Sequence, residues 1–518
     1  MRLRPCLSAL LLLGIAGCTV GPDFNPPTAD TPPKWSGTGP KPDQTSESKV
    51  TSDAAADDRW WNGFRDPELT SLIDRARDAN LDLRQAALRI AEARAAREVA
   101  GARDLPTVSL DSNYTRTKIS RNGAISLFGF PGGSGGTVGT GAGGALPSNG
   151  FNIPPFDLFQ SGFDANWEID LFGRTRRAVE SATAQTEAAA ENRNDALVSV
   201  AAEVARNYVQ LRGTQSLIAI TQQNLDAQRK AYDLTKAQAQ GGETSNLDVE
   251  AALAEVATTE ARLPALEDQK TRTINALSKL VGREPGALAV ELSAAKPIPP
   301  VPAIVAIGMP SELAHRRPDI RKAEADLHAA TANIGVSVAD LYPRLSLEGS
   351  LGIQAVRFNE LGDWASRFYN FGPNLSIPVF NGTTYANIHL EEARQQEAAL
   401  AYENTVLGAL HEVENAVSAY TAEQVRMHAL ERAAGANERS LSLAQQRYRA
   451  GLSNFLDVLD AERRLFASQT DVANSQIAIA TDLVAVYKAL GGGWADYASQ
   501  AGVNAGDAPM AQPVAAKP

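Results

Sequence analysis

The sequence predicts an α+β membrane protein made of two internal repeats of one helix–hairpin–helix–helix unit. Three observations lead to this fold class: motifs that return at a fixed interval, long helical runs without proline, and short strands with one apolar face. In the first half the recurring motifs are Asp82-Leu83-Arg84, Leu105-Pro106, Gly242 and Leu247-Asp248-Val249. Their counterparts in the second half are Asp319-Ile320-Arg321, Tyr342-Pro343, Gly451 and Leu456-Asp457-Val458. We therefore expect a first repeat over residues 59–290 and a second over 291–494.

The first residues of the chain predict export. Arg2 and Arg4 precede a short apolar stretch, residues 7–15, that is too short to span a bilayer and is typical of a signal peptide. The following Ile15-Ala16-Gly17-Cys18 resembles a bacterial lipoprotein box. We expect residues 1–17 to be a signal peptide and Cys18 to carry a covalent lipid after cleavage. An ordinary signal peptide with an incidental cysteine is the alternative.

Composition limits the classes of partner and of covalent crosslink. The formal net charge of −11 becomes more negative once the basic signal peptide is removed, which argues against nucleic acid as a partner. The only other cysteine, Cys6, leaves with the signal peptide, so the mature chain would have no disulfide. Residues 18–58 are rich in Pro, Thr, Asp and Ser and predict an extended, lipidated tether, and residues 495–518 predict a disordered tail.

Each repeat contains one long helical run and two shorter ones. The long runs, 174–238 and 382–449, carry apolar residues at steps of three and four, as in the seam of a coiled coil. The shorter runs are 80–103 and 243–281 in the first repeat and 316–340 and 452–490 in the second. In each repeat the two shorter runs placed end to end match the long run, so we expect two columns of about 100 Å, at roughly 1.5 Å per residue. Pro264 should kink one short helix. A solvent-exposed fibrous coiled coil is the alternative.

Two strand-like segments lie between the helices of each repeat, at about 105–118 and 160–172 and at about 343–353 and 368–380. The clearest places Phe163, Ala165, Trp167, Ile169 and Leu171 on one face and charged or polar residues on the other. This alternation is typical of outer-membrane barrel strands, although half-buried strands of soluble sheets share it. A sheet in lipid must have no open edge, and the smallest membrane barrels have about eight strands. Four strands per chain therefore require an oligomer.

No catalytic, cofactor or metal site is expected. The five histidines are scattered without the spacing of metal ligands, and no nucleophile elbow or P-loop occurs. The Gly-rich 121–156 connection contains a G-x-G-x-x-G match from Gly139 to Gly144. Because no βαβ unit surrounds this match, we do not expect it to bind a dinucleotide. We expect that the chain is not an enzyme and that the lipid on Cys18 is its only bound group.

Several longer motifs resemble those of a known family. They are Cys18 with Gly21-Pro22-Asp23-Phe24, Trp60-Trp61, Phe64 with Asp66-Pro67-Glu68-Leu69, Trp167-Glu168-Ile169-Asp170-Leu171-Phe172-Gly173-Arg174, Ala205-Arg206-Asn207-Tyr208, Arg316-Arg317-Pro318-Asp319-Ile320-Arg321, and Tyr448-Arg449-Ala450-Gly451. Together they resemble the TolC-like outer membrane factors, specifically the NodT-family efflux lipoproteins. The resemblance implies a trimeric, twelve-stranded outer-membrane β-barrel, with four strands per chain, continuous with a long periplasmic α-helical coiled-coil barrel.

The same resemblance implies a function and partners. The chain would be the outer-membrane exit duct of a tripartite, RND-type efflux pump that passively exports small toxic compounds or drugs. Its partners would be two further copies of itself, a periplasmic membrane-fusion adaptor, an inner-membrane pump and outer-membrane lipid. Two alternatives are the channel of a type I protein secretion system and a structural periplasmic coiled-coil lipoprotein without a pore.

The turns between helices are candidate docking sites for the adaptor. Their residues are Gly241, Gly242 and Ser245 in the first repeat and Gly451, Ser453 and Asn454 in the second. Glycine permits a tight turn, and Ser245 or Asn454 can cap the next helix. Ordinary turns would show the same residues. The resemblance implies that these tips face the adaptor.

A candidate gate lies just beyond the second turn. Leu456, Asp460 and Arg463 fall on one helix face, with Tyr448 nearby. In the family this face narrows the periplasmic entrance, and three copies of Asp460 would form an acidic ring that suits cations. Asp460 and Arg463 could latch neighbouring helices, although an ordinary exposed charge pair contributes little. The first-repeat counterparts are Leu247 and Ala251, so the two repeats are unequal at this point.

Overall fold

The computed structural model describes residues 19–28, 31–37, 48–52, 54, 57–118, 155–242 and 244–495. The expected signal peptide, Cys18, most of the Gly-rich connection and nearly all of the expected tail lie outside these residues. The described chain forms two compact units. The sheet unit comprises Arg97–Glu180 and Ala332–Glu392 with the described residues up to Asp23, and the helical unit comprises the remainder.

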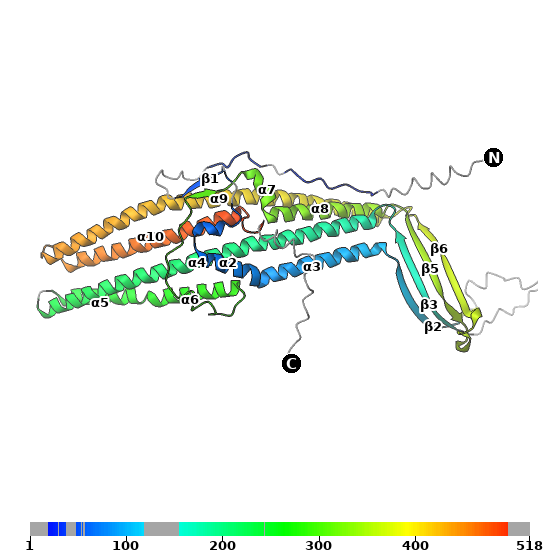
Figure 1. Ribbon diagram of the computed structural model, residues 1–518, viewed down its shortest axis with the longest axis horizontal. Coiled ribbons are helices and arrows are strands. Elements are labelled where there is room, and N and C mark those ends of the chain that lie inside the picture. Colours follow the sequence, from blue (N-terminus) through cyan, green and yellow to red (C-terminus); the bar gives the residue numbers. More distant parts are fainter. Residues whose placement is uncertain are drawn as a thin grey trace, which may run out of the picture. The chain divides into compact units, whose positions relative to one another are not determined.

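Long helices make up most of the chain (Figure 1). Two of them, α4 (Arg174–Gln240) and α9 (Gly382–Arg449), contain 67 and 68 residues. The other helices are α2 (Pro67–Ala79), α3 (Leu81–Gly101), α5 (Asn246–Glu260), α6 (Leu263–Leu280), α7 (Leu313–Arg316), α8 (Pro318–Ala339) and α10 (Phe455–Ala489). None of the described helices has both the length and the apolar composition needed to cross a membrane.

The helix expected over 243–281 is instead two helices, α5 and α6. The break falls at Ala261 and Arg262, and α6 begins with Pro264 in its first turn. Proline has no N–H to donate and its ring clashes with the preceding turn, so a new helix start accommodates it better than a kinked continuous helix. The sequence reasoning also missed α2, which begins at an N-cap, Asp66, whose side chain accepts hydrogen bonds from the backbone N–H groups of Glu68 and Leu69.

The sheet unit contains one four-stranded antiparallel sheet in the order β2-β3-β5-β6. Its strands are β2 (Thr107–Thr117), β3 (Phe156–Ile169), β5 (Arg344–Ala355) and β6 (Arg367–Ser376). Compared with expectation, β3 begins earlier and ends at Ile169, and β6 ends before Pro378. No described residue pairs with the outer edges of β2 and β6.

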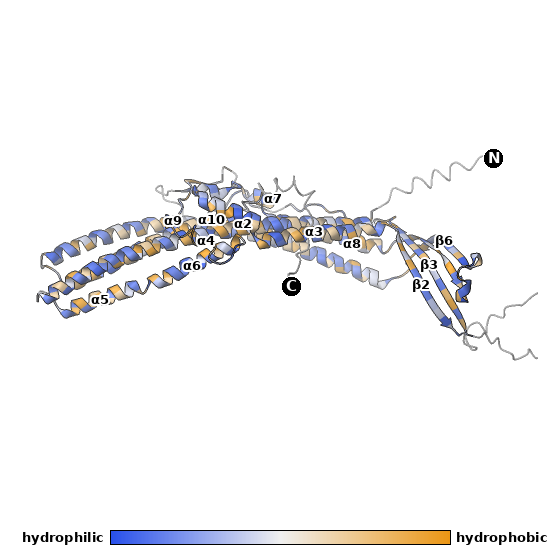
Figure 2. Ribbon diagram, turned by 60° about the horizontal axis from the view of Figure 1, so that its bottom comes forward, coloured by the Kyte–Doolittle hydropathy of each residue, from blue (hydrophilic) through white to orange (hydrophobic). Residues whose placement is uncertain are grey.

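The two faces of this sheet differ in polarity. Register places Leu110, Phe163, Leu351 and Tyr369 in one row across the four strands, and all four are exposed. The alternate positions are mostly polar, so apolar and polar residues alternate along the strands in Figure 2. An apolar sheet face left in water is unfavourable, and this one has the pattern of a face that meets lipid.

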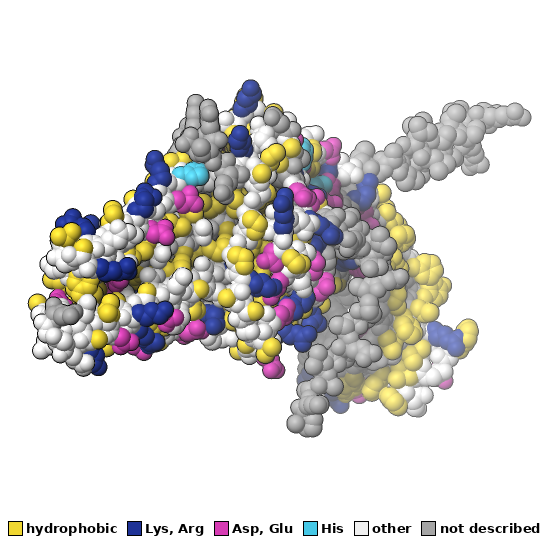
Figure 3. Space-filling model, turned by 60° about the vertical axis from the view of Figure 1, so that its left-hand side comes forward, with side chains coloured by type: hydrophobic (Ala, Val, Ile, Leu, Met, Phe, Trp, Pro, Cys, Tyr) yellow, Lys and Arg dark blue, Asp and Glu magenta, His cyan; other side chains and the backbone are white. Residues whose placement is uncertain are grey.

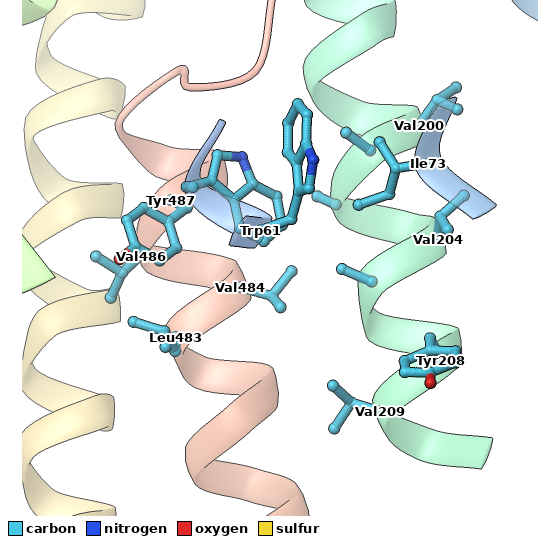
Figure 4. Packing of buried hydrophobic residues seen from close by; sticks show 14 of the residues in the cluster. Trp61, Ile73, Val200, Val204, Tyr208, Val209, Leu483, Val484, Val486 and Tyr487 are labelled. Atoms are coloured by element: carbon cyan, nitrogen blue, oxygen red, sulfur yellow. The ribbon is translucent and has the colours of Figure 1, made fainter. Parts of the chain in front are cut away.

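The core of the helical unit is built from segments far apart in the chain. Trp60, Trp61 and Phe64, from the short 3-10 helix η2 (Trp60–Phe64), are at most 1% exposed. Trp60 stacks on Tyr487 of α10 with ring centroids 5.1 Å apart. Figure 4 shows Trp61 between α10 and the valines of α4. A small parallel sheet, β1 (Lys49–Thr51) with β4 (Ile304–Ala306), belongs to the same unit.

The described residues of the expected tether make defined contacts. In the sheet unit, Arg177 donates hydrogen bonds to the carbonyl oxygens of Val20 and Gly21, at 3.2 and 3.4 Å, and to Asp23 Oδ1 at 2.6 Å. In the helical unit, the ring of Phe24 stacks on His328 with centroids 4.3 Å apart. Trp35 Nε1 donates to the carbonyl of Gly308 at 2.8 Å. These contacts hold the described residues of the segment against the residues named above, whereas its role as a tether stays a prediction.

Candidate gate and docking tips

The turn between α4 and α5 is closed by glycine and a capping box. Gly242 has φ +77°, and its N–H donates to the carbonyl of Ala239 at 3.0 Å. Ser245 caps α5, because its side chain accepts from the N–H of Asp248, whose carboxylate accepts in turn from the N–H of Ser245. Gly241 continues the last helical turn by donating to Ala237 at 3.1 Å.

The turn between α9 and α10 is built in the same way. Gly451 has φ +68° and donates to Tyr448 O at 2.9 Å, and Leu452 donates to Arg447 O at 2.9 Å. This pair of bonds is a Schellman motif, which satisfies the last carbonyls of α9. Asn454 caps α10 by accepting from the N–H of Asp457 at 3.1 Å. Ser245 and Asn454 therefore act as the helix caps that the sequence suggested.

The two turns enclose a groove. A cavity of about 770 Å³ is lined by both hairpin ends, including Ser245, Gly451, Ser453 and Asn454, whereas Gly241 and Gly242 do not line it. Figure 3, with the tip end forward, shows Lys and Arg side chains around the hairpin ends and hydrophobic side chains in the hollow between them. Four of the six candidate docking residues thus share one concave surface.

The gate candidates make contacts within the chain that differ from those expected. Asp460 pairs with Arg464 of the same helix at 2.8 Å, and both side chains are largely exposed. Arg463 does not pair with Asp460; its Nε donates to Glu255 Oε2 of α5 at 2.6 Å. Within this chain, therefore, Asp460 and Arg463 do not form the pair that was expected to latch neighbouring helices. Arg463 pairs with Glu255 because a nearly buried carboxylate without a cation costs more free energy than a solvated one such as Asp460.

The remaining gate candidates take up two different positions. The Tyr448 hydroxyl donates to Gln238 Oε1 of α4 at 2.8 Å, and its ring meets Phe455 edge-on at 5.7 Å. Leu456 is 45% exposed. Tyr448 and Arg463 therefore connect the hairpin of α9 and α10 (the second hairpin) to that of α4 and α5 (the first hairpin). Leu456 and Asp460 lie on the solvent side.

Two acidic residues of this region were missed by the sequence reasoning. Glu255 in the first repeat corresponds to Arg464 in the second. This difference in charge between equivalent positions was the feature of the sequence that could have drawn attention to Glu255. Glu462 of α10 has a buried Oε2 that finds no hydrogen-bond partner among the residues that the structure describes. Burial raises the pKa of Glu462 to about 7, and the nearby Glu255 carboxylate adds to the shift.

The stability of the helical unit should therefore depend on pH through Glu462. Because the folded state binds this proton more tightly than the unfolded chain, with its ordinary pKa of 4.5, the stabilisation present below about pH 4.5 is lost as the pH rises through about 7. We expect Glu462→Gln to flatten this part of the profile, measured as the thermal unfolding midpoint from pH 5 to 8. Asp460→Asn, at an exposed neighbour, should leave the profile as in the wild type. Equal profiles for Glu462→Gln and wild type would contradict the assignment.

Comparison with known proteins assigns this chain to a family. The family model described as "Outer membrane efflux protein" matches residues 72–283 and 309–492. The chain is 32% identical to the outer membrane protein OprJ of Pseudomonas aeruginosa over 492 residues, which cover 94% of this chain and 96% of OprJ. It is 30% identical to nodulation protein T of Rhizobium leguminosarum bv. trifolii, with 92% and 94% covered.

The similarity extends to a solved structure. The outer-membrane channel OprN superposes with a TM-score of 0.78 at 34% identity, covering 92% of this chain and 100% of OprN. The resemblance to TolC-like outer membrane factors that the motifs indicated is thereby confirmed. Since the matches in sequence and in structure run through nearly the whole chain, this protein belongs to the outer membrane efflux protein family.

Proposed function

We propose that this protein is the outer-membrane exit duct of a tripartite, RND-type efflux pump that passively releases small toxic compounds or drugs from the periplasm. The observation that carries the proposal is the four-stranded sheet with an exposed apolar face and two unpaired edges among the described residues. The same chain supplies two helices of 67 and 68 residues, whose length a globular core does not need. Membership of the efflux family supports both points.

The proposed assembly is a homotrimer. One sheet of four strands cannot close on itself in lipid, and three copies would give twelve strands within a single barrel. The helices would form a periplasmic coiled-coil barrel, and the groove between the tips would receive a membrane-fusion adaptor that links to an inner-membrane pump. A lipid on Cys18 would add an anchor in the outer membrane. The contacts of Val20, Gly21 and Asp23 with Arg177 support an anchor close to the sheet unit.

Equivalent hydrogen bonds support the proposed origin of the chain from two repeats. Asn80 Nδ2 donates to Leu280 O at 2.9 Å, and Arg317 Nη1 donates to Ala489 O at 2.5 Å. Asn80 and Arg317 are related by the same interval as Asp82 and Asp319, and Leu280 and Ala489 by the same interval as Gly242 and Gly451. Because the two repeats share these contacts, their helices would form parts of the duct wall that are equal in height.

The gate of this duct is proposed to close by holding the second hairpin against the first. The Arg463–Glu255 ion pair and the Tyr448–Gln238 hydrogen bond connect the two hairpins. Asp460 and Leu456, on the solvent side of α10, would line the narrow entrance, and three Asp460 carboxylates would favour cations. In this scheme, opening requires the Arg463–Glu255 contact to break.

Single-channel conductance in a planar bilayer tests the proposal. We expect the wild type to show small, rarely open currents, and Arg463→Ala to open at least several-fold more often, because it loses a charge-assisted hydrogen bond to a nearly buried carboxylate. Asp460→Ala should mainly reduce cation preference. Arg272→Ala serves as the control, since Arg272 forms an exposed pair within α6. Absence of current from every variant, with a monomeric protein, would favour a coiled-coil lipoprotein without a pore.

A further inference from the structure

One row of the sheet departs from the pattern of its polar face. Register pairs Asp111 with Gly162, Gly162 with Gly352, and Gly352 with Phe368. Because side chains alternate along strands, these four positions lie on the face opposite the exposed apolar row. The row therefore has only two side chains, a carboxylate on β2 and an aromatic ring on β6, with two glycines between them.

The two glycines bring the backbones of β3 and β5 unusually close. A Cβ on Gly352 would lie 2.7 Å from Gly162 Cα, and a Cβ on Gly162 would lie 3.0 Å from Gly352 Cα. The same Cβ on Gly352 would lie 2.9 Å from Phe368 Cε1. The ring of Phe368 thus leans over the backbone of Gly352 and is half-buried, whereas Phe371, on the other face of β6, is 76% exposed.

The rows on either side of this one are polar. One contains Ser109, Asp164, Ser350 and Asn370, and the other contains Asn113, Gln160 and Gln354. Along the strands, this face carries the acidic residues Asp111, Asp164, Glu168 and Glu348, against one basic residue, Arg344. A wall with this excess of carboxylates attracts cations. Phe368 is therefore an aromatic surface whose neighbouring rows are polar and partly acidic, whereas Leu158 and Phe156 lie further along the same face of β3.

We propose that Asp111 and Phe368, with the Gly162–Gly352 floor between them, form a recognition site for organic cations that carry an aromatic or large apolar body. Asp111 supplies the opposite charge, and Phe368 supplies a ring on which an aromatic body of the cation can stack. Gly162 and Gly352 carry no side chains of their own, so a flat molecule beside the Phe368 ring could approach the backbone at Gly162. The site rests on the proposed function, because the polar face lines the pore only if the sheets close into a barrel.

The proposal predicts that small hydrated cations and lipophilic organic cations interact differently with this site. A small hydrated ion such as K⁺ would gain from Asp111 but not from the ring. A lipophilic cation such as tetraphenylphosphonium would gain from both, and would slow the K⁺ current while it occupies the site. Tetramethylammonium has no ring that could stack on Phe368 and keeps only the attraction of its charge to Asp111 and to the face of the ring, so it would lose less when the ring is removed.

Block of the K⁺ current in a planar bilayer provides the test, with tetraphenylphosphonium and tetramethylammonium as probes. We expect Phe368→Leu to weaken block by tetraphenylphosphonium about two- to ten-fold, the range of an aromatic stacking pair, and by a larger factor than it weakens block by tetramethylammonium. Leucine keeps an apolar cover over Gly352, so the K⁺ conductance should stay near that of the wild type. Asp111→Asn should weaken block by both cations. Phe371→Leu, on the opposite face of the same strand, should change neither.

Three outcomes would overturn the proposal. Unchanged tetraphenylphosphonium block in Phe368→Leu, with normal K⁺ conductance, would leave Phe368 as a cover for the glycine pair and the exit duct intact. Wild-type block no stronger for tetraphenylphosphonium than for tetramethylammonium would exclude an aromatic contribution. Absence of any wild-type K⁺ current would remove the exit duct itself, and the recognition site with it.

Discussion

Replacing Glu68 by alanine is expected to lower the free energy of unfolding by about 3–5 kcal/mol, the usual cost of removing one partner of a buried ion pair. Glu68 Oε2 accepts from Arg212 Nη2 at 2.6 Å, and Arg212 is 0% exposed. The guanidinium also donates to Gln215 Oε1 at 2.8 Å and to the carbonyl of Ala294 at 2.9 Å, and it lies 4.8 Å from the ring centroid of Tyr208; all three groups are neutral. Without Glu68, a buried positive charge would lose the carboxylate that compensates it.

Substitution of Glu68 is more informative than substitution of Arg212. Lys296 also bonds to Glu68, so removing Arg212 would leave the carboxylate with a cation. Glu291→Ala is the matched control, because Glu291 pairs with Arg75 at the surface, where each side chain is 40% exposed and such a pair contributes at most about 1 kcal/mol. Urea unfolding followed by circular dichroism measures both variants. Similar losses for Glu68→Ala and Glu291→Ala would contradict the buried pair as a source of stability.

Replacing Trp61 by alanine should also cost about 3–5 kcal/mol, the range for removing a large aromatic side chain from a core. Trp61 is 1% exposed, meets Trp60 edge-on with centroids 5.7 Å apart, and lies under the guanidinium of Arg77 at 5.6 Å from its ring. It lies between α4 and α10 (Figure 4). The cavity left by alanine would therefore separate helices from both repeats.

Trp61→Phe distinguishes packing from hydrogen bonding. The indole Nε1 of Trp61 is buried and has no hydrogen-bond partner among the described atoms, so phenylalanine would remove no bond. We expect this variant to lose less than half of what Trp61→Ala loses in the same urea titration. Equal losses for phenylalanine and alanine would mean that the indole has a partner, such as an ordered water, that matters as much as its volume.

The long helices could be predicted from the sequence because their apolar period persists over many turns and glycine marks their ends. The strand faces were readable for a similar reason, since Phe163, Ala165 and Trp167 alternate with polar residues and alternation fixes which side chains share a face. The helix caps Ser245 and Asn454 were also readable, because capping depends only on neighbours along the chain.

The contacts between distant segments could not be predicted in this way. The Arg463–Glu255 pair joins residues separated by 208 positions, and its formation depends on the rotation of α5 against α10. Periodicity indicates which face of a helix is apolar, but it does not say which charged residue on the partner lies opposite. The row of Asp111, Gly162, Gly352 and Phe368 depends on strand register in the same way, and a shift of one residue would move Phe368 beside a different neighbour.

The glycines of the two tip turns impose a requirement of handedness rather than of size. A Cβ added to Gly242 or Gly451 would meet no atom within 4 Å, yet both residues have φ near +70°. An L-amino acid at either position would strain the backbone even though its side chain pointed into open solvent. Loss of adaptor binding in a Gly242 or Gly451 variant would therefore mix a distorted turn with a lost contact. Ser453, which lines the groove and does not have a left-handed backbone, reports on docking without that ambiguity.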